Sequence, residues 1–124
     1  MKFINDTKAP KAVGTYSQGT YVAPFYFFSG QIGLDPLTGE MAPDFDAQLK
    51  LIFSNIDALL AGTGLKKENI VKSTVFLTDL NFFPKVNQAY TEYFATPYPA
   101  RTTVEVSKLP KGGLVEIEII AADK

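Results

Sequence analysis

Residues 44–78 read DFDAQLKLIFSNIDALLAGTGLKKENIVKSTVFLT, a helical pattern followed by a strand pattern. In the first half, apolar side chains recur at intervals of three and four residues, which predicts an amphipathic helix. These side chains are Phe45, Leu49, Ile52, Phe53, Ile56, Leu59 and Leu60. Asp44 precedes the pattern as the expected N-cap, and Gly62 and Gly64 follow it. Residues 70–78 are rich in β-branched side chains and predict a strand covered on both faces.

The segment before this helix predicts two strands. Residues 16–22 and 25–31 are rich in Tyr, Phe and Val, and the short Ala23-Pro24 connection between them indicates a β-hairpin. Residues 33–41, GLDPLTGEM, contain Asp-Pro and Thr-Gly pairs, which mark turns. The chain is therefore expected to open with a hairpin and to reach the helix through a loop.

The segment after the central strand predicts another helix and two more strands. The expected elements are a helix at 81–94, a strand at 101–108, a turn at 109–113 and a strand at 115–121. Pro84 is acceptable only in the first turn of that helix, and Pro97 and Pro99 cannot continue it.

The resulting order, ββαβαββ, favours a single α+β domain over residues 1–124. A mixed sheet would carry both helices on one face, which is one of the stable ways to bury an apolar layer. Because the strands are apolar on both sides, the other face of the sheet would be left bare. We therefore expect an oligomer that covers it.

The composition excludes several classes of chemistry and of partner. The chain has no cysteine and no histidine, which rules out thiolate nucleophiles, disulfides, Ser-His-Asp triads and histidine metal sites. Its net charge is -1 and its lysines are scattered, so no nucleic-acid partner is expected. The longest apolar run, residues 21–28, contains Pro24 and is far short of the ~20 residues that span a bilayer. Residues 1–14 lack the apolar segment of a signal peptide, so we expect a cytoplasmic protein.

Arg101 is the single arginine of the chain and the first candidate for a binding residue. Its planar fork of donors can hold a carboxylate at two points, which a lysine cannot do. A structural ion pair with an acid of the chain is the alternative, and position alone leaves both open. Other candidates, each of which could equally be structural, are Tyr16, Ser17, Ser29, Gly30, Gln31, Glu116 and Glu118.

A simple geometric argument limits how Arg101 and Glu116 can act together. If residues 101–108 and 114–122 formed a plain hairpin, Arg101 would lie opposite about Ala121, and Glu116 would be ~16 Å away along the strand. A joint site therefore requires that these strands are not hairpin partners, or that the two residues come from different subunits.

Several short segments, spread in order over residues 9–122, carry a resemblance to a known family. They are APKAVGTYSQG at 9–19, FSGQIG at 28–33, TGE at 38–40, IVKSTVFL at 70–77, VN at 86–87, PARTTVEV at 99–106 and VEIE at 115–118. These segments resemble the RidA (YjgF/YER057c/UK114) family of reactive-intermediate deaminases.

The resemblance implies a chorismate-mutase-like fold that assembles as a homotrimer with clefts between neighbouring subunits. In such a fold the last strand lies between the N-terminal hairpin and the central strand, so Arg101 and Glu116 need not be hairpin partners. The signature arginine that binds the substrate carboxylate corresponds to Arg101, and the acid thought to hold the attacking water corresponds to Glu116. The other positions of the ligand cleft correspond to Tyr16, Ser29, Gly30, Asn87 and the backbone of Thr103.

The reaction that the resemblance implies is the hydrolysis of 2-imino acids, such as 2-iminopropanoate and 2-iminobutanoate, to 2-keto acids and ammonia. An iminium carbon is already electrophilic, so orientation and a general base suffice, and no metal or other cofactor is expected. Three departures bear on specificity. Thr15 stands where many members have proline, Thr103 where many have cysteine, and the loop at 95–99 is shorter than in some relatives.

Two other functions stay open from the sequence. A trimeric module could bind carboxylates or keto acids without turnover, as a sensor or a chaperone-like partner, and would need Arg101 but not Glu116. Action on RNA, described for some members of the family, is disfavoured by the single arginine and the net charge of -1.

Overall fold

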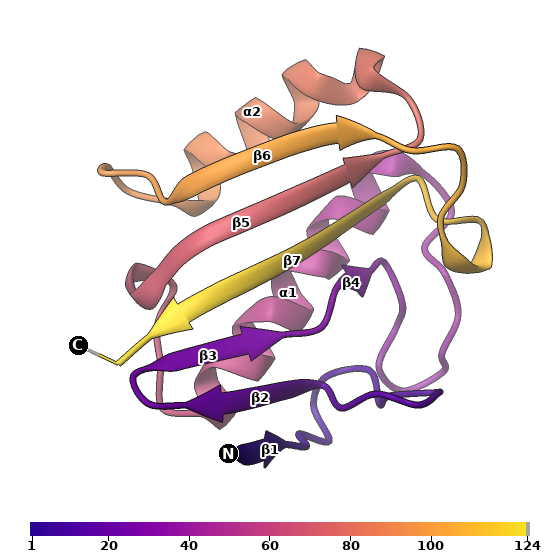
Figure 1. Ribbon diagram of the computed structural model, residues 1–124. Helices are drawn as coiled ribbons and strands as arrows, with labels where there is room; N and C mark the ends of the chain where they lie inside the picture. The colour runs from indigo at the N-terminus through magenta and orange to yellow at the C-terminus, as the bar shows by residue number, and fades with distance from the viewer. Residues whose placement is uncertain (124) are drawn as a thin grey trace.

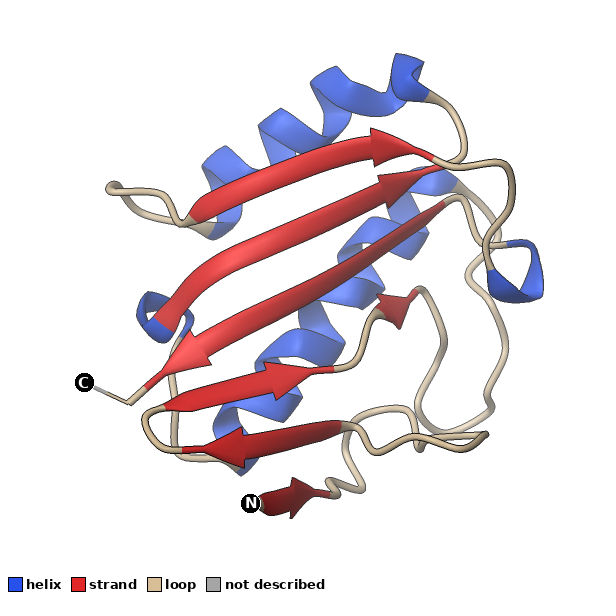
Figure 2. Ribbon diagram, viewed as in Figure 1, coloured by secondary structure: helices blue, strands red, loops and turns tan. Residues whose placement is uncertain are grey.

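The computed structural model describes residues 1–123 as one mixed sheet with two helices against one of its faces (Figures 1 and 2). The strands are β1 (Lys2–Ile4), β2 (Gly19–Val22), β3 (Phe25–Phe28), β4 (Gln31–Ile32), β5 (Ile70–Leu77), β6 (Ala100–Glu105) and β7 (Val115–Ala122). The helices are α1 (Phe45–Gly62) and α2 (Phe83–Tyr93), with 3₁₀ turns at Lys67–Asn69, Leu80–Phe82 and Pro110–Gly112. This confirms the predicted α+β class. Within the described residues, neither helix is long and apolar enough to cross a membrane.

The last strand lies in the interior of the sheet. The strand order is β1-β2-β3-β7-β5-β6, and β4 also pairs with β7. β7 is antiparallel to β3 and β5, whereas β5 and β6 are parallel. Because β5 separates β6 from β7 (Figure 1), the strands that carry Arg101 and Glu116 are not hairpin partners. Every second residue of β7, from Val115 to Ala121, is buried, because these side chains point to the face that the helices cover.

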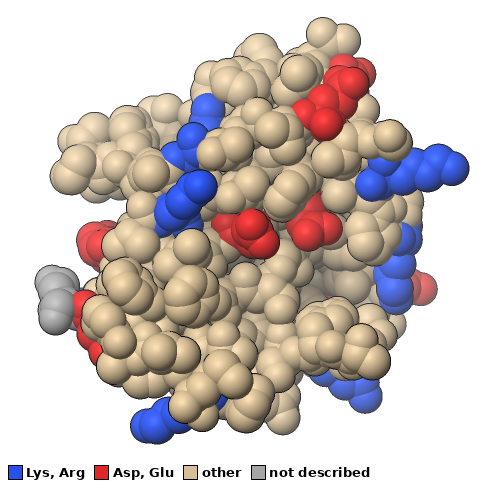
Figure 3. All heavy atoms as spheres, viewed as in Figure 1, with Lys and Arg blue, Asp and Glu red and all other residues tan. Residues whose placement is uncertain are grey.

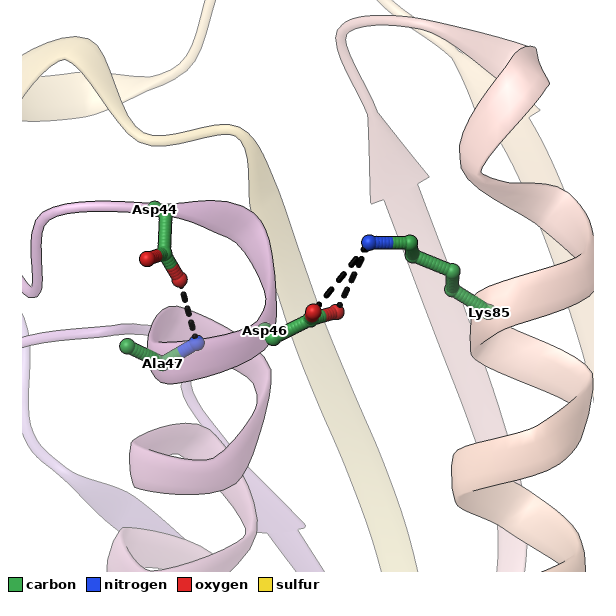
Figure 4. A network of polar contacts seen from close by, with 4 residues as sticks. All are labelled: Asp44, Asp46, Ala47 and Lys85. Carbon is green, nitrogen blue, oxygen red and sulfur yellow. Dashed lines mark hydrogen bonds and ion pairs between the residues drawn. The ribbon is translucent and has the colours of Figure 1, made fainter.

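α1 has the N-cap that the sequence predicts (Figure 4). The Asp44 carboxylate accepts a hydrogen bond from the backbone N–H of Ala47 at 2.9 Å. Beyond the other end, Gly64 has a φ of 76°, which glycine adopts without strain. Asp46 in the first turn forms an exposed ion pair with Lys85 of α2, at 3.1 Å. Exposed ion pairs of this kind contribute little to stability.

Aromatic packing joins α2 to α1. Phe82, directly before α2, stacks on Phe45 with ring centroids 4.0 Å apart. Tyr93 near the other end stacks on Phe53 at 4.3 Å. Pro84 lies in the first turn of α2, as predicted, where its missing N–H would have no partner in any case. Together the two helices cover one face of the sheet.

The N-terminal strands differ from their predicted bounds. The sequence patterns do not predict β1, and β2 begins at Gly19 rather than at residue 16. The predicted strand at 25–31 is divided into β3 and β4. Phe27 pairs with Ile120 and Gln31 pairs with Ile117. The chain therefore advances four residues from Phe27 to Gln31 while the paired strand β7 advances only three. This irregularity is a β-bulge, which re-aims the local side chains and interrupts the strand.

The prediction that residues 70–78 are covered on both faces is wrong for the single chain. Ser73, Val75 and Leu77 are buried, whereas Thr74 and Phe76 are only half-buried on the opposite face. The reason is that both helices lie on the same side of the sheet (Figure 1). The face without helices, which we call the open face, carries apolar side chains as well as the polar residues Glu116 and Glu118. Its apolar members include Val22, Phe25, Phe27, Phe76, Val104 and Ile120.

Candidate functional site

The predicted site residues lie on two opposite faces of the sheet. On the edge strand β6, Arg101 pairs with Ser73 of β5, whose side chain is buried under the helices. On β7, Glu116 pairs with Phe76, which belongs to the open face. Because directly paired residues point to the same face of a sheet, Arg101 points toward the helices and Glu116 points away from them.

Neutral groups hold Arg101. Its Nη2 donates a hydrogen bond of 2.7 Å to Oδ1 of Asn87 on α2. Its guanidinium carbon lies 4.9 Å from the ring centroid of Tyr90 and 5.3 Å from that of Phe83. The one ion pair found within residues 1–123 joins α1 to α2 and does not involve Arg101. In this part of the chain, the alternative of a structural ion pair for Arg101 therefore does not hold.

Glu116 lines a cleft of about 420 Å³. The candidates from the sequence that share this cleft are Tyr16, Ser29, Gly30 and Gln31. Glu118, the next outward-facing residue of β7, also lines it, together with Lys11 from a loop and Lys111 from the 3₁₀ turn at Pro110–Gly112. In Figure 3, which views the open face, acidic atoms lie near the centre with basic atoms beside them, and further atoms of both signs lie toward the rim. The cleft therefore contains both signs of charge alongside apolar side chains.

The bulge between β3 and β4 brings the backbone against Glu116. The backbone N–H of Ser29 donates to the carbonyl of Gln18 at 2.9 Å, and its hydroxyl donates to the carbonyl of Ser17 at 2.6 Å. Gly30 follows, and a Cβ placed on it would lie 2.8 Å from Cδ of Glu116. An added Cβ fits only if the flexible Glu116 side chain moves away, so glycine at this position lets the carboxylate lie against the backbone.

A buried glutamine anchors the loop that carries Tyr16. The side chain of Gln18 is 3% exposed, and its Nε2 donates to the carbonyls of Asp6 and Pro10, both at 2.9 Å. Its Oε1 accepts a hydrogen bond from the backbone N–H of Asp6. These bonds hold the loop against the sheet as one wall of the cleft, while Tyr16 stays 52% exposed. Gln18 lies inside the strand predicted at 16–22, and no local pattern there predicts this role.

The surroundings of Glu116 favour its neutral form. Its half-buried position raises the pKa of the Glu116 carboxyl above the usual value, and repulsion from Glu118 raises this pKa further. A carboxylate with a raised pKa is a stronger base near neutral pH. The group is therefore suited to take a proton from a water molecule held beside it.

Thr103 belongs with Arg101 rather than with Glu116. It lies two residues farther along β6, opposite Val75 of β5, so its side chain also faces the helices. Its hydroxyl oxygen is buried and has no hydrogen-bond partner among residues 1–123. The structure thus forms one group from Arg101, Asn87 and Thr103, and another from Tyr16, Ser29, Gly30 and Glu116. It does not unite the two groups within one chain.

Comparison with known proteins decides the family. The profile of the family described as Endoribonuclease L-PSP matches residues 6–123. The chain belongs to this family, the RidA family. A RidA-family relative from Bos taurus, named 2-iminobutanoate/2-iminopropanoate deaminase, is 45% identical over 121 residues, which cover 97% of this chain and 88% of that protein.

Solved structures of RidA-family proteins share the whole fold. A crystal structure of RidA from the Antarctic bacterium Psychrobacter sp. PAMC 21119 has a TM-score of 0.96 at 44% identity and covers 99% of this chain and 100% of that one. The structure of Escherichia coli TdcF with bound serine has a TM-score of 0.92 at 41% identity and covers 100% of both chains. These likenesses confirm the RidA resemblance and the predicted fold class.

Proposed function

We propose that this RidA-family protein hydrolyses 2-imino acids to 2-keto acids and ammonia, at sites formed between the subunits of a homotrimer. One observation carries the proposal: no carboxylate of residues 1–123 neutralises the guanidinium of Arg101. A planar fork of free donors matches the carboxylate of a small acid. The name of the bovine relative supplies the substrate class, 2-iminobutanoate and 2-iminopropanoate.

Two copies of the chain are needed to complete the proposed site. β5 lies between β6 and β7, so roughly 10 Å separate Arg101 from Glu116 across the sheet. The register places Arg101 level with Ile119, which adds roughly 10 Å along the strands. Since the two side chains also point to opposite faces, they cannot contact one small ligand within a single chain. Burial of the apolar open face against a neighbouring subunit is the contact that we expect to join them.

In this mechanism, Arg101 fixes the substrate by its carboxylate. Asn87 occupies one N–H of the guanidinium, and the remaining in-plane N–H groups donate to the two carboxylate oxygens. β6 is an edge strand, so part of its backbone is free of sheet pairing, and we assign the backbone N–H of Thr103 to the same carboxylate. Tyr16 and Ser29 of the neighbouring subunit steady the imino nitrogen.

Glu116 acts as the general base. It holds a water molecule whose oxygen attacks C2 of the protonated imine. As the O–C bond forms, the C=N electron pair moves to nitrogen and Glu116 takes the proton from the water. The carboxyl group returns this proton to the amino nitrogen of the tetrahedral intermediate. The C–N bond then breaks, the hydroxyl proton is lost as the C=O bond forms, and nitrogen leaves as ammonia, which takes up that proton.

Subunit complementation tests the shared site directly. Arg101→Ala and Glu116→Gln are each expected to hydrolyse imine poorly, because every site then lacks one half. Co-expressed at equal levels, they should regain about a quarter of wild-type turnover, since random pairing of two subunit types restores one site in four. Turnover is measured as suppression of semicarbazide trapping while a dehydratase supplies 2-iminobutanoate. Co-assembled variants that stay as inactive as either parent would contradict the proposal.

The structure of TdcF with bound serine favours one other candidate, a module that binds amino or keto acids without turnover. Both functions use Arg101, so Glu116 discriminates between them. A catalytic site requires that Glu116→Gln loses imine hydrolysis while its affinity for 2-oxobutanoate is kept. A binding module requires that wild type and Glu116→Gln hydrolyse imine equally slowly.

A further inference from the structure

Two aromatic rings flank the guanidinium of Arg101, and both come from α2. Phe83, Asn87 and Tyr90 are spaced by four and three residues, which places them on one face of this helix. That face meets β6 at Arg101, with the guanidinium carbon 5.3 Å from the centroid of Phe83 and 4.9 Å from that of Tyr90. The sequence predicts the helix that carries both rings but does not predict that they contact Arg101. The structure shows that the guanidinium lies over both rings.

The ring of Tyr90 is fixed by its own surroundings. Its side chain is 5% exposed, and its hydroxyl forms a hydrogen bond of 2.9 Å with the hydroxyl of Ser73. Ser73 is fully buried and is the direct cross-strand neighbour of Arg101. Tyr90 therefore connects the helix, the central strand and the arginine. Phe83, which is 37% exposed, supplies the second ring at the rim of this site.

Aromatic faces and carboxylates hold an arginine in different ways. A carboxylate accepts the in-plane N–H groups and neutralises the charge. An aromatic ring attracts the cation through its face and leaves the in-plane donors free. In this chain Asn87 takes one donor and the rings take none, so the charge is stabilised while the fork stays available.

We propose that Phe83 and Tyr90 are positioning residues, which hold the plane of Arg101 from its faces so that its free N–H groups meet the substrate carboxylate in one orientation. This inference rests on the proposed function, because it assumes that Arg101 binds the carboxylate. Preorganisation of this kind acts mainly on binding, since it lowers the ordering cost that the ligand must otherwise meet. The rings themselves need not touch the reacting atoms.

Phe83→Leu is the main test, because Leu keeps the apolar character and removes the aromatic face. We expect the dissociation constant for 2-oxobutanoate and the KM for 2-iminobutanoate to rise about 3- to 10-fold, with a smaller change in kcat. Phe83→Trp should keep both constants within about 2-fold of wild type, because it restores a π-face. The Tm of Phe83→Leu should stay within about 2 °C of wild type, since the side chain is partly exposed.

Phe82→Leu is the matched control. It removes the neighbouring ring, which stacks on Phe45 and is not among the rings that contact Arg101. This variant should lower the Tm and leave the affinity for 2-oxobutanoate unchanged. Equal affinities in wild type, Phe83→Leu and Phe83→Trp, together with weak binding by Arg101→Ala, would overturn the positioning role alone. Unchanged affinity in Arg101→Ala would overturn the proposed function as well.

Discussion

The surroundings of Arg101 and of Glu116, the two halves of the proposed site, have opposite effects on the charged side chain that they contain. Arg101 lies between a neutral amide and two aromatic faces, which stabilise its charge without cancelling it. Glu116 lies half-buried near a second carboxylate, which makes its charged form less favourable. An arginine that binds an anion must keep its charge and have N–H groups that no other acceptor occupies. General base catalysis requires a carboxylate that accepts a proton readily.

Their separation by the sheet keeps each half suited to its role. In contact within one chain, Arg101 and Glu116 would form an ion pair, which would lower the pKa of Glu116 and occupy the guanidinium donors. On opposite faces they cannot neutralise each other. The difference between the halves therefore predicts that variants of one half affect turnover and variants of the other affect binding.

The largest effect is expected for Glu116→Gln. Removal of the general base should lower kcat for imine hydrolysis by about 10²- to 10⁴-fold, because the amide cannot take a proton from water. The dissociation constant for 2-oxobutanoate should change less than about 2-fold, since the carboxylate of the ligand meets the other half. Stopped-time ammonia release and calorimetric titration measure the two quantities. A large loss of affinity with kcat unchanged would break the division of roles.

Arg101→Ala is expected to have the next largest effect, and on binding. Loss of a hydrogen bond to a charged partner weakens the stabilisation of the bound substrate and transition state by about 1.5–3 kcal/mol. This corresponds to a decrease of roughly 10- to 150-fold in kcat/KM. Most of the change should appear in KM, and Arg101→Lys should recover only part of it, because an ammonium lacks the planar fork. Steady-state kinetics on dehydratase-generated imine provide the values. Equal turnover by wild type and Arg101→Ala would remove Arg101 from the site.

Gly30→Ala sharpens the description of the Glu116 half. The added methyl would lie 2.8 Å from Cδ of Glu116, so the carboxylate must move. A misplaced base should lower kcat by about 10- to 100-fold. In the double variant Gly30→Ala/Glu116→Gln, the Gly30→Ala change should lower kcat little further, because the side chain that it displaces is no longer a base. Losses that multiply in the double variant would show that Gly30 acts elsewhere.

The smallest effect concerns pH. Because the pKa of Glu116 is raised by burial and then by Glu118, kcat/KM should increase as the pH rises through that pKa and the base ionises. Glu118→Gln removes the repulsion, so the increase in kcat/KM should occur at lower pH. Burial should still keep the pKa of Glu116 above that of an ordinary glutamate. The native state favours neutral Glu116, so Glu116→Gln should have a larger free energy of unfolding than wild type at pH 7. This difference should decrease toward acid pH, because Glu116 of the wild type then becomes neutral as well. A pH–rate profile unaffected by Glu118→Gln would contradict this electrostatic account.

Local patterns predicted the helices well. The spacing of apolar residues after Asp44 identifies α1, and Asp44 caps it as expected. The first turn of α2 contains Pro84, also as predicted. Helices are accessible to such reasoning because each turn depends on neighbours only three or four residues away. The bulge at Ser29 and Gly30 is different, because it arises where β3 and β4 pair with β7, about 90 residues later in the chain.

Composition and motif content set the chemistry that this protein can perform. Without histidine or cysteine, and with one arginine in a RidA-like segment, the chain is limited to carboxylate, hydroxyl, amide and guanidinium groups. Packing between distant segments of the chain determines which of these groups lie close together. Along a strand, side chains alternate as a local rule, but the face that receives the helices depends on long-range contacts. These contacts placed Arg101 against two rings of α2 and left Glu116 on the open face.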